Sequence, residues 1–197
     1  MKLILASGSP RRAEILRRAG FIFDALETRI EEVHRTGESP EAYVQRLAIA
    51  KARAAADDLI DWAETTFIVG ADTTVVVAGE MFEKPVDTID ARRMLRLLSH
   101  HRTHDVLTGI SVIVLPEGQS VNFVERTRVE FSELSEAEIE KYIATGEAFG
   151  KAGAYAIQGY AGRYVGRVEG CYFNVMGLPL SRVWNAMLSL GWTDSAP

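Results

Sequence analysis

The hydrophobic positions along this 197-residue chain follow two periodicities, which predicts a mixture of strands and helices. Short apolar runs at 2–6, 67–71, 74–77 and 105–115 are typical of buried strands. The runs at 67–71 and 74–77 are predicted as separate strands with a two-residue break between them. Apolar residues alternate with polar ones over 121–131, which indicates a strand with one buried face.

Helix starts are marked by N-capping residues and prolines. They are predicted at positions 9, 39, 87, 135 and 179. The second of these helices is predicted to end near Asp57. Glu138 completes a capping box with Ser135. Crossover helices combined with long antiparallel runs predict an α/β fold, a long mixed twisted β-sheet flanked by helices.

The composition adds limits on the class of protein. Hydrophobic residues make up 47% and charged residues 25%, which excludes disorder and supports a single domain over residues 1–197. One cysteine, Cys171, excludes an intrachain disulfide framework and favours a reducing compartment. No apolar run approaches the ~20 residues of a membrane span, so we expect a cytoplasmic protein without membrane contact. The net charge of −5 argues against binding to nucleic acid.

A segment of small polar and basic residues at 7–12 follows the first predicted strand and opens the first helix. A helix N-terminus offers free backbone N–H groups and the positive end of the dipole, which suits a phosphate. Arg11 and Arg12 are unfavourable against that dipole, and a bound anion would explain them. The alternative is a solvated basic turn. The segment has neither the Walker lysine nor the Gly-x-Gly-x-x-Gly spacing of the general phosphate-binding motifs.

Lys51 lies on the apolar face of the second predicted helix, together with Val44 and Leu47. A lysine in that position either extends its amine to solvent or meets an anion in a cleft. Extension to solvent is the commoner outcome, so the position alone leaves both open.

Three further polar positions border apolar runs. Asp72 lies where a buried strand is predicted to end, and acts there as a general base or metal ligand or as a turn cap. Lys84 is held extended before Pro85, where it reaches a phosphate or is an exposed loop lysine. Gln158 either hydrogen-bonds a base edge or satisfies a backbone group.

The histidine cluster and the cysteine predict no further site. His100, His101 and His104 lie where a helix is expected to end near Ser99, and no carboxylate has the matching spacing of a metal site. Cys171 follows a Glu-Gly turn and is interpreted as a strand residue, not as a nucleophile.

Six segments occur in one order over nearly the whole chain. They are Leu5–Arg12, Lys51–Arg53, Gly70–Thr73, Glu83–Pro85, Lys151–Tyr155 and Gly177–Pro179. Together they resemble the Maf family. The resemblance implies a house-cleaning pyrophosphatase that cleaves a nucleoside triphosphate between its α and β phosphates with Mg²⁺ or Mn²⁺. It also implies an inosine-triphosphatase-like fold with two lobes and a central cleft, and a link to septum formation and the arrest of cell division.

The resemblance assigns roles to the candidate residues. Asp72 matches the family's catalytic acid, which would accept a proton from the attacking water while holding metal. Glu31 or Glu32 would add a second metal contact. Ser7 and the backbone amides after it would cradle a phosphate. A cationic clamp for the triphosphate would be formed by Arg11, Arg12, Lys51 and Lys84.

Three positions separate the branches of the family. Arg11, Thr73 and Gln158 resemble the dTTP/UTP branch, whereas the 7-methyl-GTP branch has tryptophan, glutamine and glutamate there. Uracil and thymine present an N3–H donor between two carbonyls, which an amide can match, whereas a carboxylate suits a cationic methylated guanine. We therefore expect hydrolysis of dTTP and UTP, with modified pyrimidine triphosphates as further candidate substrates.

Two alternatives remain open. One is a 7-methyl-GTP pyrophosphatase of the same family, and the other is a non-enzymatic, nucleotide-binding regulator of septum formation. A regulator would keep the cationic clamp but would not need Asp72. The oligomeric state is open as well, with a homodimer as one expected form.

Overall fold

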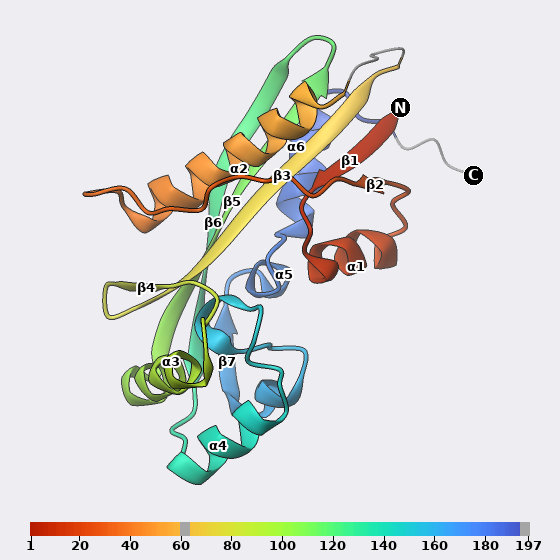
Figure 1. Cartoon of the computed structure of the whole chain (residues 1–197). Coiled ribbons are helices and arrows are strands. Elements are labelled where there is room, and N and C mark those ends of the chain that lie inside the picture. The colour runs from red at the N-terminus through yellow and green to blue at the C-terminus, as the bar shows by residue number, and fades with distance from the viewer. Residues whose placement is uncertain (60–63, 194–197) are drawn as a thin grey trace. The chain divides into compact units, whose positions relative to one another are not determined.

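The computed structural model describes residues 1–59 and 64–193 and has the predicted α/β architecture (Figure 1). A seven-stranded mixed sheet has the order β2-β1-β3-β5-β6-β7, and β4 pairs with β3. The strands are β1 (Lys2–Ala6), β2 (Asp24–Ala25), β3 (Thr66–Val77), β4 (Glu80–Phe82), β5 (Thr103–Leu115), β6 (Gln119–Phe131) and β7 (Val165–Glu169). Strand β1 is parallel to β2 and β3, whereas β4 and β7 are antiparallel to their partners.

All the α-helices except α5 begin at the predicted positions. The helices are α1 (Pro10–Arg18), α2 (Pro40–Asp57), α3 (Thr88–His101), α4 (Glu136–Ala144), α5 (Tyr172–Val175) and α6 (Leu180–Ser189), with short 3-10 helices η1 (Ala152–Ala154) and η2 (Tyr160–Tyr164). Side chains of Ser39, Asp87 and Ser135 accept the expected capping hydrogen bonds. None of the helices in the described residues is long and apolar enough to cross a membrane.

The chain divides into two compact units. The first contains Met1–Asp72, Thr108–Glu125 and the chain from Gly177 onward, and the second contains Thr73–Leu107 and Arg126–Met176. Strands β3, β5 and β6 contribute residues to both units.

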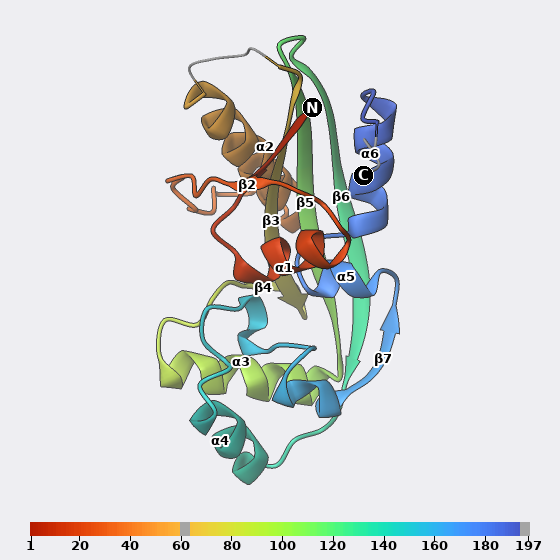
Figure 2. The ribbon, with the colours of Figure 1, turned by 90° about the vertical axis from the view of Figure 1, so that its right-hand side faces the viewer.

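In the first unit, α2 packs closely on the sheet because two glycines leave room for its backbone. A Cβ at Gly70 of β3 would overlap the Ala48 carbonyl oxygen, and a Cβ at Gly109 of β5 would overlap that of Val44. Figure 2 shows α2 and α6 on opposite faces of the strands of this unit. The alanine-rich side of α2 therefore lies directly against β3, which carries Asp72.

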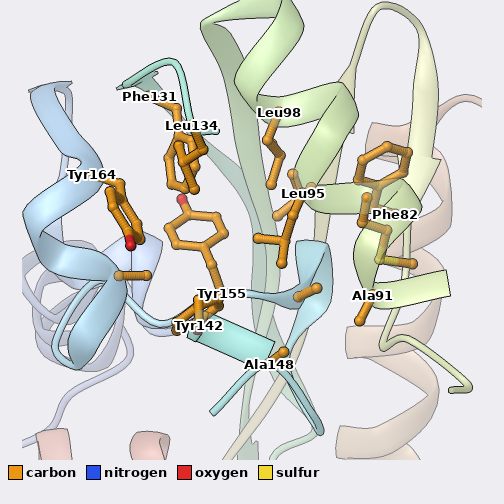
Figure 3. Close-up of a cluster of buried hydrophobic side chains, with 14 of the residues drawn as sticks. Phe82, Ala91, Leu95, Leu98, Phe131, Leu134, Tyr142, Ala148, Tyr155 and Tyr164 are labelled. Carbon is orange, nitrogen blue, oxygen red and sulfur yellow. The ribbon is translucent and has the colours of Figure 1, made fainter. Parts of the chain in front are cut away.

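The second unit has an aromatic and aliphatic core over which α3 and α4 pack (Figure 3). Tyr155 lies within this core, with Tyr164 and Leu95 on either side. Paired arginine–glutamate contacts also join α3 to α4: Arg92 to Glu140, and Arg96 to Glu136. These contacts hold α3 against α4.

Three local predictions were wrong. Strand β3 runs unbroken through Asp72 and Thr73, so the two predicted strands are one. Its β-ladder partners lie elsewhere in the chain, and a local pattern does not reveal that pairing. Cys171 is not a strand residue but the N-cap position of α5. Helix α3 continues to His101, past the end predicted near Ser99.

Candidate active site

The loop between β1 and α1 is organised by Ser7 and Arg12. Arg12 donates from Nη1 to Ser7 Oγ at 2.9 Å and from Nε to the Gly177 carbonyl at 2.7 Å. The Ser9 backbone N–H also donates to Ser7 Oγ, at 3.2 Å. Within the described part of the chain, the Ser9 side chain makes no capping hydrogen bond to α1. The first turn of α1 therefore keeps backbone N–H groups that the Ser9 side chain does not cap, as an anion-binding helix terminus requires.

Burial shapes the charge of Arg12. Its side chain is buried, and burial lowers the pKa of its guanidinium, while the negative charge of Asp72 opposes this shift and the charge of Arg11 adds to it. Arg11 itself is half-buried in the first turn of α1. Two guanidinium groups at one helix N-terminus repel each other, which favours an anionic ligand at this place.

The centre of the first unit is an ion-pair cluster around Lys51. Its Nζ lies 2.6 Å from Asp72 Oδ1 and also contacts Glu32 Oε1. The Lys51 and Asp72 side chains are only 9% and 8% exposed, whereas that of Glu32 is 35% exposed. The sequence alternative in which Lys51 extends to solvent is therefore wrong, because α2 packs it against the carboxylates of β3 and the 28–39 loop.

Asp72 is the most constrained group of this cluster. Burial raises the pKa of its carboxyl above the ordinary value, and the positive charges of Lys51 and Arg12 oppose the rise. Its Oδ2 is buried without a hydrogen-bond partner among the residues that the structure describes. A buried carboxylate oxygen without a partner is costly, and such atoms are retained where a ligand completes them.

The structure separates the two candidate glutamates. Glu32 contacts Lys51 and raises the pKa of Asp72 by its charge, whereas Glu31 is an exposed loop residue. Groups of three or more histidine, cysteine or carboxylate side chains able to hold a metal do not occur in the described residues. A cation held here would therefore take two carboxylates from the protein and its other ligands from substrate and water, a set that suits Mg²⁺.

The second unit carries Thr73, Lys84 and Gln158. Thr73 follows Asp72 in β3 and is half-buried, and Lys84 is exposed in the loop between β4 and α3. The Gly153 backbone N–H donates to the Glu83 carbonyl at 3.2 Å, which ties the segment 151–154 to the Lys84 loop. Gly153 has a φ of +71° and would place a Cβ 2.9 Å from the Val75 side chain, so glycine is required there.

Gln158 lies exposed in a tight turn that two side chains hold in place. The Gly159 N–H donates to the Ala156 carbonyl at 3.1 Å and closes the turn. The Ala156 N–H donates to the Tyr142 hydroxyl at 3.2 Å, and the Tyr160 N–H donates to Glu147 Oε2 at 2.8 Å. Any Cβ at Gly159 would overlap the Glu147 carboxylate. The turn therefore presents Gln158 outward on a fixed backbone.

Comparison with known proteins identifies the family of this chain. The family model described as "Maf-like protein" matches residues 2–190. The chain belongs to the Maf family. A dTTP/UTP pyrophosphatase of Koribacter versatilis (strain Ellin345) is 49% identical over 193 residues, covering 97% of this chain and 95% of the relative. A dTTP/UTP pyrophosphatase of Geobacillus sp. (strain WCH70) is 49% identical over 192 residues, covering 97% of this chain and 99% of the relative.

One solved structure has a much weaker likeness to this Maf family chain. It is a nucleoside-triphosphatase / dITP/XTP pyrophosphatase from Mycobacterium abscessus, with 18% sequence identity and a TM-score of 0.40. The likeness covers 75% of this chain and 95% of that one. This overlap is too low to support a conclusion about fold or function.

The sequence did not predict two residues outside the Maf motifs that hydrogen-bond to the backbone of the Gln158 turn. Tyr142 and Glu147 hold the Gln158 turn, yet Tyr142 appears in the sequence only as an apolar-face residue of a helix. Glu147 follows Gly146, and glycine is common just after a helix end, so the next side chain is a candidate for binding backbone N–H groups. That signal was available for Glu147, whereas none marks the Tyr142 hydroxyl.

Proposed function

We propose that this chain hydrolyses dTTP and UTP to the nucleoside monophosphate and pyrophosphate. Family membership and the names of its relatives support this reaction. The observation that carries the proposal is the buried Asp72 carboxylate, with one oxygen on Lys51, the other without a described partner, and Arg12 close enough to affect its pKa. Such a carboxylate beside fixed cations suits proton abstraction next to a bound polyphosphate.

In this mechanism, Asp72 accepts a proton from the water that attacks the α-phosphorus. A bond forms between the water oxygen and the α-phosphorus, and the bond from the α-phosphorus to the oxygen bridging to the β-phosphate breaks. Pyrophosphate leaves with the electron pair of that bond. Arg12, fixed by Ser7 and Gly177, and the first-turn amides of α1 offset the negative charge that builds on the phosphates.

The carboxylates of Asp72 and Glu32 fit a divalent cation, Mg²⁺ or Mn²⁺. Both already contact one cationic group, and Asp72 Oδ2 is left without a described partner. Carboxylate oxygens are the ligands that these hard ions prefer. When bound, the ion would supply Lewis-acid stabilisation of phosphate oxygens. Of the two glutamates proposed from the sequence, Glu32 is the one we retain.

Base selection is proposed for Gln158, and Arg11 and Thr73 are proposed as further substrate contacts. The outward position of Gln158 on a fixed turn supports this role, because an amide can both donate to and accept from the edge of uracil or thymine. Lys84 is proposed as a further phosphate contact, from its exposed position on a loop tied to Gly153.

The test is kcat/KM for dTTP, UTP and 7-methyl-GTP, measured as pyrophosphate release by the wild type and by Gln158→Glu. We expect the wild type to prefer the two pyrimidine nucleotides. Gln158→Glu removes a donor and adds a negative charge, so the pyrimidine preference should fall by a factor of about 5 to 150. A wild-type preference for 7-methyl-GTP would contradict the proposed substrate, and an unchanged ratio in the variant would contradict the role of Gln158.

A further inference from the structure

Lys51 occupies an unusual position for a lysine that is also proposed to bind phosphate. Its ammonium lies between the carboxylates of Asp72 and Glu32, at 2.6 Å from Asp72 Oδ1. The Lys51 and Asp72 side chains are both more than nine-tenths buried. The single positive charge of the ammonium therefore offsets one of the two negative charges.

The same two carboxylates are the proposed ligands of the divalent cation. An ammonium bonded to both acids occupies the space and the oxygen lone pairs that such an ion needs. Two cations cannot share that space without strong repulsion at this low exposure. Lys51 therefore cannot contact the two carboxylates and a phosphate at the same time as the carboxylates hold a metal ion. We treat the two sets of contacts as two successive states.

We propose that Lys51 holds the cation position of the substrate-free protein and leaves it for the triphosphate when metal and nucleotide bind. This inference rests on the proposed function and adds an exchange to it. The long side chain of Lys51 has four rotatable bonds after its Cα, so its ammonium can move while α2 stays packed on Gly70. Asp72 Oδ2 is buried and has no hydrogen-bond partner among the described residues, so a cation can bind this oxygen without displacing a hydrogen bond from it.

The exchange couples the two ligands. In the substrate-free protein, a metal ion has to displace Lys51 from the carboxylates, which weakens metal binding. Phosphate oxygens give the displaced ammonium a new partner and so remove that penalty. Because coupling is reciprocal, nucleotide should tighten metal binding by the same factor as metal tightens nucleotide binding.

The test measures Mn²⁺ binding to nucleotide-free protein by electron paramagnetic resonance, for the wild type and Lys51→Met. Methionine keeps an unbranched chain of four heavy atoms and removes the terminal ammonium with its charge. We expect Lys51→Met to bind Mn²⁺ about ten-fold or more tightly than the wild type, although it loses triphosphate hydrolysis. Arg53→Met is the matched control, because Arg53 is an exposed cation on the same helix. Solvent screens an exposed charge, so this variant should change the Mn²⁺ affinity by less than about two-fold.

Equal or weaker Mn²⁺ binding by Lys51→Met would overturn the exchange. If Lys51→Met folds poorly, a second measurement on the wild type tests the exchange. A non-hydrolysable dTTP analogue should tighten Mn²⁺ binding to the protein. Unchanged Mn²⁺ affinity in the presence of the analogue would overturn the exchange. The inference and the proposed function fail separately. Wild-type protein without dTTP or UTP hydrolysis contradicts the function, whereas hydrolysis combined with unchanged Mn²⁺ affinity in Lys51→Met contradicts the exchange alone.

Discussion

His104 and Tyr155 form a buried hydrogen-bonded pair that joins β5 to the segment carrying Gln158. The His104 Nε2 and Tyr155 hydroxyl lie 2.7 Å apart, and His104 Nδ1 has no hydrogen-bond partner in the described part of the chain. Burial lowers the pKa of His104 to about 4, against a smaller opposing effect of Asp105. Desolvation therefore keeps this imidazole neutral at physiological pH, and it has a structural role in the second unit.

The pH dependence of stability follows from this shift. The unfolded chain protonates His104 near pH 6.5 and the folded chain only near pH 4, so stability present above pH 6.5 is lost as the pH falls between these values. We expect a loss of about 3 kcal/mol in the free energy of unfolding from this residue alone. The measurement is urea unfolding from pH 7 to pH 4.

The control for this experiment is the double variant His104→Phe with Tyr155→Phe. It replaces both partners with apolar rings of similar shape and leaves neither polar group unpaired. The unfolding free energy of the wild type minus that of the double variant should fall by about 3 kcal/mol between pH 7 and pH 4. A difference that stays constant over this pH range would show that His104 is not kept neutral by burial.

Helix α2 positions Lys51 because its backbone approaches β3 and β5 at glycines. A Cβ at Gly70 would overlap the Ala48 carbonyl oxygen and lie 2.7 Å from the Ala52 backbone nitrogen. Ala52 follows Lys51, so any displacement of α2 at this point also moves the ammonium away from Asp72. Stability and activity thus depend on the same contact between helix and sheet.

Gly70→Ala should therefore destabilise the protein and reduce dTTP hydrolysis. Overlap with backbone atoms costs about 1–3 kcal/mol or more, because the helix has to shift. Thermal unfolding and kcat/KM measure the two effects. Gly166→Ala in β7 is the matched control, since its Cβ would meet its nearest neighbour only at 4.0 Å. Equal effects of the two substitutions would contradict the importance of this contact.

The Gln158 turn depends on the end of α4 and the residues after it. Glu147 accepts the Tyr160 N–H, and Gly159 leaves room for the Glu147 carboxylate. Loss of a hydrogen bond to a charged group typically costs about 1.5–3 kcal/mol. This hydrogen bond therefore stabilises the backbone conformation of the turn that carries Gln158.

Glu147→Ala should lower kcat/KM for dTTP about ten-fold and reduce the preference for dTTP over 7-methyl-GTP. Glu147→Gln keeps an acceptor oxygen and should restore most of both. Glu117→Ala, at an exposed position between β5 and β6, is the control for loss of a carboxylate. If Glu147→Ala retains the wild-type preference, the turn does not need this residue to present Gln158.

At the scale of the whole molecule, local signals predicted the elements better than the contacts between them. The caps at Ser39, Asp87 and Ser135 set helix starts correctly, because capping is decided within four residues of chain. Asp72 was open to interpretation as a turn residue, since the partner that accounts for its burial lies 21 residues away in α2. Pattern and spacing do not reveal such a pairing.

The candidate site shows the same division. Ser7, Arg12, Lys51 and Asp72 were predicted from the sequence and lie in the first unit, with contacts among them that the sequence did not specify. A polar loop without periodicity gave no basis for choosing between Glu31 and Glu32 as the metal contact, and the contact of Glu32 with Lys51 supports the proposal of Glu32. The supporting roles of Tyr142 and Glu147 depend on tertiary placement of main-chain N–H groups.

Charge is also organised at the molecular scale. The chain carries a net charge of −5, yet its proposed ligand is a triphosphate. Many of its surface arginines pair with carboxylates, as in the contacts between α3 and α4. The local field around Arg11 and Arg12, and not the net charge, therefore favours the anion.

The most direct test of the proposed function follows dTTP by phosphorus NMR with the wild type and with Asp72→Asn in the presence of Mg²⁺. The wild type should form dTMP and pyrophosphate in equal amounts. Asp72→Asn should still bind dTTP in a calorimetric titration, but its turnover should fall by about 10²–10⁴, as expected for loss of a general base. Formation of dTDP and phosphate by the wild type, or near-wild-type turnover by Asp72→Asn, would contradict the account.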